Sequence, residues 1–163
     1  MAIEAAADNE TDDAIIRVWQ RLPGLRRLSL TARPGPASQT GWRGAATADI
    51  VAEADGDDWR LIERGRFSPA PAGRSVVFEN IYRWRRAGDR LQLYHERFGA
   101  SAAVFLFELV TETDSRLTCR QPHFCGDDVY RGALSLTPTG FDLDWSISGP
   151  RKDEHLFYRY RTA

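Results

Sequence analysis

Along most of the chain after residue 25, hydrophobic and polar residues alternate with a period of two. This is the pattern of β-strands that bury one face. It is clearest where Phe141, Leu143, Trp145 and Ile147 alternate with aspartates and serines. Nine or ten strands are expected, in the segments Leu25–Arg33, Arg43–Glu53, Asp58–Phe67, Val76–Arg86, Arg90–Phe98, Ala103–Val110, Arg116–Cys119, Tyr130–Thr137, Phe141–Ser148 and Glu154–Thr162.

One amphipathic helix is expected before the strands. Ile15, Trp19 and Leu22 follow helical spacing, and a Pro-Gly pair comes directly after them. Asp12 or Asp13 can cap its first turn, and the Pro-Gly pair stops it. So short a helix cannot form a core alone, so it is expected to lie against the strands.

The connections between the expected strands decide the fold class. Short breakers such as Ala87-Gly88-Asp89 and Gly149-Pro150 allow neighbouring strands to pair as hairpins. The pattern predicts a mostly β fold, a single antiparallel up-and-down β-barrel with one short N-terminal helix, over residues 13–163. A barrel is favoured over a sandwich because closure removes exposed strand edges. The lumen of such a barrel is either filled by side chains or open to one small ligand.

Composition narrows the function classes. The acidic, alanine-rich residues 1–12 are expected to form a disordered tail. The chain has 22 basic and 23 acidic residues, and the net charge of −1 argues against a nucleic-acid partner. No stretch approaches the ~18 apolar residues of a membrane span, so no membrane partner is expected. The first residues lack a basic region followed by an apolar core, so they are not expected to be a secretory signal. The chain has two cysteines and no recognisable export signal, so the reducing cytoplasm is its expected location.

Four strings carry a resemblance to a known family: LIERG at 61–65, YRW at 82–84, PHFCGDDVY at 122–130 and WSISGPRKD at 145–153. With them, the chain from about Leu22 to Tyr160 resembles an uncharacterised family of small bacterial proteins with a lipocalin-like, or calycin-type, β-barrel. The resemblance implies the barrel, with the helix near one end, and it implies no activity. The usual calycin Gly-x-Trp opening is altered after Gly24, and Trp19 or Trp42 is the candidate to replace its tryptophan.

Cysteine, histidine and aspartate gather between two of the expected strands. Cys119, His123 and Cys125 are soft metal ligands, but their spacing matches no common zinc pattern, so no metal is expected. In a nucleophile site, His123 would activate Cys125, and Asp127 or Asp128 would orient the imidazole. The favoured interpretation is a capping loop in which a cysteine packs as a small apolar residue and an aspartate binds the amides of a tight turn.

The connection between the last two strands carries adjacent cations. Arg151 and Lys152 together can clamp a carboxylate or phosphate. The alternative is that one of them pairs with Asp153 while the other is solvated.

Two ionisable residues interrupt apolar strand faces. Glu63 follows Leu61 on one face, and His95 follows Leu93 on another. If these faces line the lumen, both residues are buried and need partners such as Arg83 or Arg97, because an unpaired buried charge is costly. Such a cluster can orient the polar end of a ligand or act as acid and base. The alternative is a satisfied polar network inside a solid barrel.

These features predict a barrel that binds a small, partly apolar molecule with an anionic or polar group, and that needs no cofactor. The candidate ligand-binding residues are Glu63, His95, His123, Cys125, Asp128, Tyr130, Arg151 and Lys152. One alternative is a cofactorless enzyme that uses His123, Cys125 and Asp128, or the internal pair of Glu63 and His95. A second is a non-catalytic interaction protein. The chain is expected to be a monomer or a homodimer.

Overall fold

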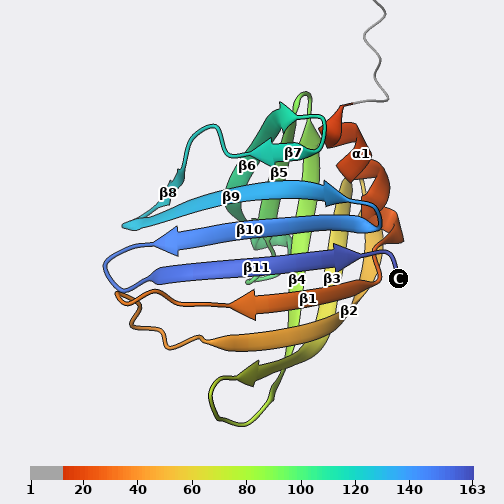
Figure 1. Cartoon of the computed structure of the whole chain (residues 1–163). Helices are drawn as coiled ribbons and strands as arrows, with labels where there is room; N and C mark the ends of the chain where they lie inside the picture. Colours follow the sequence, from red (N-terminus) through yellow and green to blue (C-terminus); the bar gives the residue numbers. More distant parts are fainter. Residues whose placement is uncertain (1–12) are drawn as a thin grey trace, which may run out of the picture.

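Residues 13–163 are described by a computed structural model, shown in Figure 1, and the tail expected at residues 1–12 lies outside them. Ten strands form a closed antiparallel barrel, since each pairs with its neighbours in chain order and β11 pairs with β1. These strands are β1 (Arg27–Ala32), β2 (Gly44–Asp55), β3 (Asp58–Pro69), β4 (Val76–Ala87), β5 (Arg90–His95), β6 (Val104–Thr113), β7 (Arg116–Thr118), β9 (Asp128–Thr137), β10 (Gly140–Ser148) and β11 (Asp153–Arg161). The expected fold class is confirmed, and each expected strand segment overlaps one of these strands.

A further short strand, β8 (His123–Cys125), pairs only with the first residues of β9. The two strands form a hairpin through Gly126, whose φ of 61° lies in the left-handed region that favours glycine. The sequence analysis favoured a capping loop for this segment. Three residues are too few to show an alternating pattern, so the pairing gave no periodic signal.

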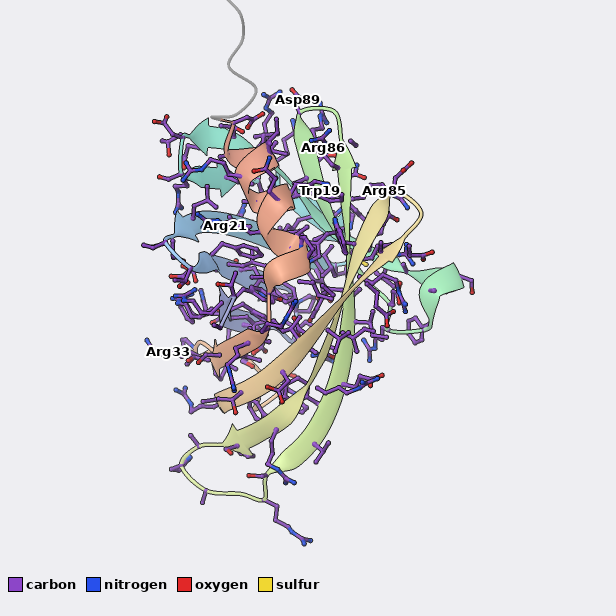
Figure 2. The ribbon with its side chains drawn as sticks, turned by 90° about the vertical axis from the view of Figure 1, so that its right-hand side faces the viewer. Trp19, Arg21, Arg33, Arg85, Arg86 and Asp89 are labelled. Atoms are coloured by element: carbon purple, nitrogen blue, oxygen red, sulfur yellow. The ribbon has the colours of Figure 1, made fainter. Side chains whose placement is uncertain are left out.

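Helix α1 (Ala14–Arg21) and the 3-10 turn η1 (Leu22–Gly24) cover one end of the barrel, as Figure 2 shows. Asp13 is the N-cap, and its Oδ1 accepts a hydrogen bond from the Ile15 N–H at 3.0 Å. Ile15 and Val18 are buried, so the apolar face of the helix closes this end. No helix within residues 13–163 is long and apolar enough to cross a membrane.

The two tryptophans that could replace the calycin tryptophan, Trp19 and Trp42, lie at opposite ends of the barrel. Trp19 lies on α1 and packs against the core. Trp42 lies in the loop between β1 and β2 at the opposite end, where 57% of its surface is exposed. The expectation that Trp42 replaces the calycin tryptophan at the base is therefore wrong. Trp84, in the half of β4 nearer the helix, is fully buried against Phe141.

The connections alternate between the two ends because the strands run up and down. Two-residue turns lie at the helix end, at residues 56–57, 88–89, 114–115 and 138–139. Longer connections lie at the other end, at residues 33–43, 70–75, 96–103, 119–127 and 149–152. We call the end with the longer connections the mouth.

Arg83 belongs to an ion-pair cluster on the outside of the barrel. Its guanidinium donates to Asp58 Oδ2 at 2.9 Å and to Glu96 Oε1 at 2.8 Å. All three side chains are less than a tenth exposed. Arg83 was expected as a partner for Glu63, and this expectation is wrong. Tyr82 points into the barrel, and because consecutive strand residues face opposite sides, Arg83 points outward.

Candidate ligand-binding site

A pocket of about 400 Å³ opens at the mouth. Its volume lies within the range of small-molecule sites, roughly 300–1,000 Å³. Its walls are mostly aliphatic and aromatic, with four polar residues among them. The lining residues are Leu30, Ala32, Thr40, Trp42, Phe67, Val76, Phe78, Asn80, Ile147, Lys152, Glu154 and Leu156.

One wall of the pocket is the β3–β4 hairpin, whose outer edge on β4 extends beyond β5. Residues 76–80 of β4 pair with β3 but not with β5, whose pairing begins where Tyr82 meets His95. The β3–β4 hairpin therefore extends past β5, at the lower left of Figure 1, while β2 stays paired with β3 as far as Pro69. Phe67 and Phe78 line the pocket from this hairpin, and Trp42 packs edge-on against Phe67 with ring centroids 5.2 Å apart.

The rim of the pocket carries one carboxylate and one ammonium group. Glu154 is nearly buried, and its Oε1 accepts hydrogen bonds from Ser38 Oγ at 2.6 Å and from Thr40 Oγ1 at 2.8 Å. Lys152 Nζ donates to Asp128 Oδ2 at 2.7 Å, and this hydrogen bond raises the pKa of the lysine. The lysine is therefore firmly positive at neutral pH.

The β10–β11 turn and the β8–β9 hairpin share this rim. The hydrogen bond between Lys152 and Asp128 joins them directly. Asp153 pairs with neither adjacent cation, and its Oδ2 instead accepts from the Ala37 N–H at 3.3 Å. Arg151 is exposed and makes no ion pair within residues 13–163. Of the eight predicted site residues, Lys152 alone lines the pocket.

The residues of the proposed nucleophile site lie near one another without bonding. Cys125 is exposed and lies opposite Asp128 in the β8–β9 pairing. The His123 ring contacts aromatic rings instead, with centroids 4.7 Å from Phe105 and 6.2 Å from Tyr130. No hydrogen bond within the described part of the chain joins the histidine to Cys125 or to an aspartate.

The cysteines also occupy different environments. Both are free thiols, and the Cys119 Sγ accepts a hydrogen bond from the Gly132 N–H at 3.2 Å. Burial raises the pKa of the Cys119 thiol, so it is a poor thiolate ligand. Among residues 13–163, no three histidine, cysteine or acidic side chains are grouped as a metal site.

Glu63 lies in the lumen and is completely buried. Its Oε1 accepts a hydrogen bond from the Tyr160 hydroxyl at 2.6 Å, while Oε2 has no partner in the described residues. Burial raises the pKa of this carboxyl to about 8, although the bond from Tyr160 opposes the rise. The expected arginine partner is absent, and a tyrosine takes its place.

His95 reaches a tyrosine rather than Glu63. Its ring stacks on Tyr82 with centroids 4.8 Å apart, and the Tyr82 hydroxyl lies 3.2 Å from that of Tyr158. Burial lowers the pKa of the imidazole, and the charge of Arg97 lowers it further. The expected pair of Glu63 and His95 is therefore not in contact, and a group of buried tyrosines occupies this part of the lumen. We call Glu63, Tyr82, Tyr158 and Tyr160 the lumen cluster.

The sequence analysis missed Glu154 and the tyrosines of β11. A signal was present, because Glu154, Tyr158 and Tyr160 share a period-two face with Leu156. Glu154 is the acidic residue at the start of this face, and its position there indicates the rim of the pocket. Trp42 gave no such signal because it lies in a loop.

One protein family matches this chain over the whole barrel. The model of a family of unknown function, DUF6314, matches residues 27–162. The chain belongs to this family. The match to DUF6314 begins at the first residue of β1 and ends just after β11, so it includes every strand and every residue that lines the pocket, and leaves α1 outside. No curated protein and no solved structure matches the chain.

Proposed function

We propose that this DUF6314 protein is a calycin-like barrel of the bacterial cytoplasm that binds a small, largely apolar molecule with an anionic group. The observation that carries this proposal is the mouth pocket, which is apolar along its walls and has Lys152 at its rim. An apolar pocket with a few placed polar groups is the usual form of a small-molecule site.

The apolar walls supply the affinity in this proposal. Leu30, Phe67, Phe78, Ile147 and Leu156 line the pocket from five different strands. Each Å² of apolar ligand surface that they remove from water stabilises the complex by roughly 25 cal/mol. Because α1 closes the other end, the ligand enters at the mouth.

The rim supplies the preference for an anion. Within residues 13–163, Lys152 Nζ makes one hydrogen bond, to Asp128, and an ammonium group has three donors. It can therefore bind a ligand carboxylate without giving up its bond to Asp128. The other acid at the rim, Glu154, accepts two hydroxyl donors on Oε1, which offset part of its negative charge.

Filling the pocket is expected to abolish binding. Ala32 lines the pocket from β1, so Ala32→Phe places a ring in the space of the ligand. We expect 1-anilinonaphthalene-8-sulfonate, an apolar probe with a sulfonate, to bind at least about tenfold more weakly to this variant. The measurement is a fluorescence titration, with decanoate as the displacing ligand.

The matched control is Ala45→Phe, which adds the same ring at an exposed position of the neighbouring strand β2. It is expected to bind the probe as the unmodified protein does. Equal affinity of the Ala32→Phe variant and the unmodified protein would place the probe elsewhere and remove the basis of the proposal.

The charge of Lys152 is expected to matter for anions alone. Lys152→Met keeps most of the apolar stem and removes the ammonium, so decanoate should bind at least about tenfold more weakly while decanol binds unchanged. Arg151→Met is the control, because Arg151 is exposed and does not line the pocket. Isothermal titration calorimetry with both ligands checks this. If decanol and decanoate lose affinity equally, Lys152 acts on the pocket shape and does not recognise the anion.

A further inference from the structure

The lumen cluster contains a polar atom with no partner. Glu63 Oε2 is completely buried and has no hydrogen-bond partner in the described residues, whereas Oε1 accepts from Tyr160 at 2.6 Å. Buried polar atoms without a partner are uncommon in folded proteins, and each requires an explanation. A bound ligand that supplies the missing partner is such an explanation.

Glu63 is paired with a residue that lines the pocket. Glu63 on β3 is the direct cross-strand partner of Asn80 on β4, and Asn80 lines the pocket. Directly opposite residues have Cβ atoms about 5 Å apart on the same face. On another wall, Leu30 of the pocket lies opposite Tyr158 of the lumen cluster. The cluster therefore lies immediately beyond the deep end of the pocket.

The hydrogen bond from Tyr160 to Oε1 makes Glu63 Oε2 a hydrogen-bond donor when the carboxyl is protonated. Because Oε1 already accepts a hydrogen bond from the Tyr160 hydroxyl, the protonated carboxyl carries its own proton on Oε2, as a donor. Burial raises the pKa of Glu63 to about 8, so this form prevails at neutral pH. The titratable groups that face it are Tyr82 from β4 and Tyr158 and Tyr160 from β11, and burial raises the pKa of each. Its partner on β2 is the apolar Ile50.

We propose that Glu63 donates a hydrogen bond from Oε2 to a carbonyl oxygen at the buried end of the ligand, so that the pocket selects apolar carboxylates that carry a carbonyl group far from the carboxylate. This inference rests on the proposed function, which places the carboxylate at Lys152. It adds the second polar group of the ligand and the residue that recognises it.

Two acids of equal chain length test the proposal. Decanoate ends in a methyl group, and 9-oxodecanoate differs from it only by a carbonyl next to that end. At pH 6.5, the unmodified protein is expected to bind the oxo acid at least about tenfold more tightly than decanoate. Glu63→Leu removes the donor and should bind both acids equally. Glu63→Gln keeps an acceptor for Tyr160 and a donor for the ligand, and should retain the preference.

The pH dependence separates a donor from a residue that only shapes the pocket. In the unmodified protein, the preference for the oxo acid should disappear as the pH rises from about 7 to about 9, because Glu63 loses the donated proton. In Glu63→Gln it should persist, since the amide does not titrate. The pKa of Lys152 is raised, so the lysine stays charged through this range.

The outcomes distinguish this inference from the proposed function. If the unmodified protein binds both acids with equal affinity, the carbonyl is not recognised and the inference is wrong, while the proposed function stands. A preference that survives in Glu63→Leu also overturns it. If neither acid binds, the proposed function fails and the inference fails with it.

Discussion

Glu63→Gln is expected to stabilise the protein at pH 8 by several kcal/mol and to have little effect near pH 4. The cause is the raised pKa of Glu63, about 8 in the folded protein against ~4.3 in an unfolded chain. Between these values the folded protein holds a proton that the unfolded chain has lost. Its free energy of unfolding therefore falls as the pH rises, by roughly 5 kcal/mol in all, and levels off above pH 8.

Urea unfolding of both proteins at intervals from pH 4 to pH 9 measures this difference. The unmodified protein should show the falling stability, and the glutamine variant should lack this component because its amide does not titrate. The control is Glu79→Gln, on the exposed β3–β4 hairpin, where the carboxylate pairs with Arg64 at the surface. This change should alter stability by less than about 1 kcal/mol. Parallel curves for Glu63→Gln and the unmodified protein would show that Glu63 is ionised in the folded state.

Arg83→Met is expected to lower the free energy of unfolding by about 3 kcal/mol. Arg83 bridges the buried carboxylates of Asp58 and Glu96, and removing one partner of a buried ion pair leaves the other charges poorly compensated. The loss should lie at the lower end of the usual range, because Arg85 still pairs with Asp58 and Arg60 with Glu96.

Chemical denaturation at pH 7 tests this, with Arg86→Met as the control. Arg86 is exposed and forms no ion pair within residues 13–163, so its replacement should change stability by no more than about 0.5 kcal/mol. The pKa of Asp58 is lowered, chiefly by its hydrogen bond to Arg85, and that of Glu96 chiefly by its bond to Arg60. These pairs stabilise the protein above about pH 4, and their contribution is lost as the pH falls further. A loss below about 1 kcal/mol for Arg83→Met would show that Arg60 and Arg85 suffice.

The fold could be predicted from the sequence because each barrel strand buries one face. Alternation marks such strands directly, as in Phe141–Ser148, which became β10. The position of the helix could also be predicted, because its N-cap Asp13 and the Pro-Gly pair that ends it are signals that act within a few residues. Strand β8 was not predicted, because its three residues are too few to show alternation and are held in place by pairing with β9.

The candidate site could be predicted only in part. Alternation tells which side of the wall a residue faces, so it placed Glu63 inside. It does not tell how far along the barrel axis a residue lies, because that depends on the stagger between strands. For this reason Phe67 and Phe78, which lie in the expected strand segments Asp58–Phe67 and Val76–Arg86, could not be recognised as pocket walls. Lys152 was found because two adjacent cations in a short turn are a local signal.

The free edge of the β3–β4 hairpin has a consequence for exchange of a ligand with solvent. Residues 76–80 are hydrogen-bonded on one side only, to β3, so this segment can move outward together with β3 without breaking any bond to β5. The width of the entrance can thus change while the pairing of β4 with β5 is kept. The rate at which a molecule leaves the pocket can then change through substitutions in the connection at residues 70–75, which lies outside the paired strands.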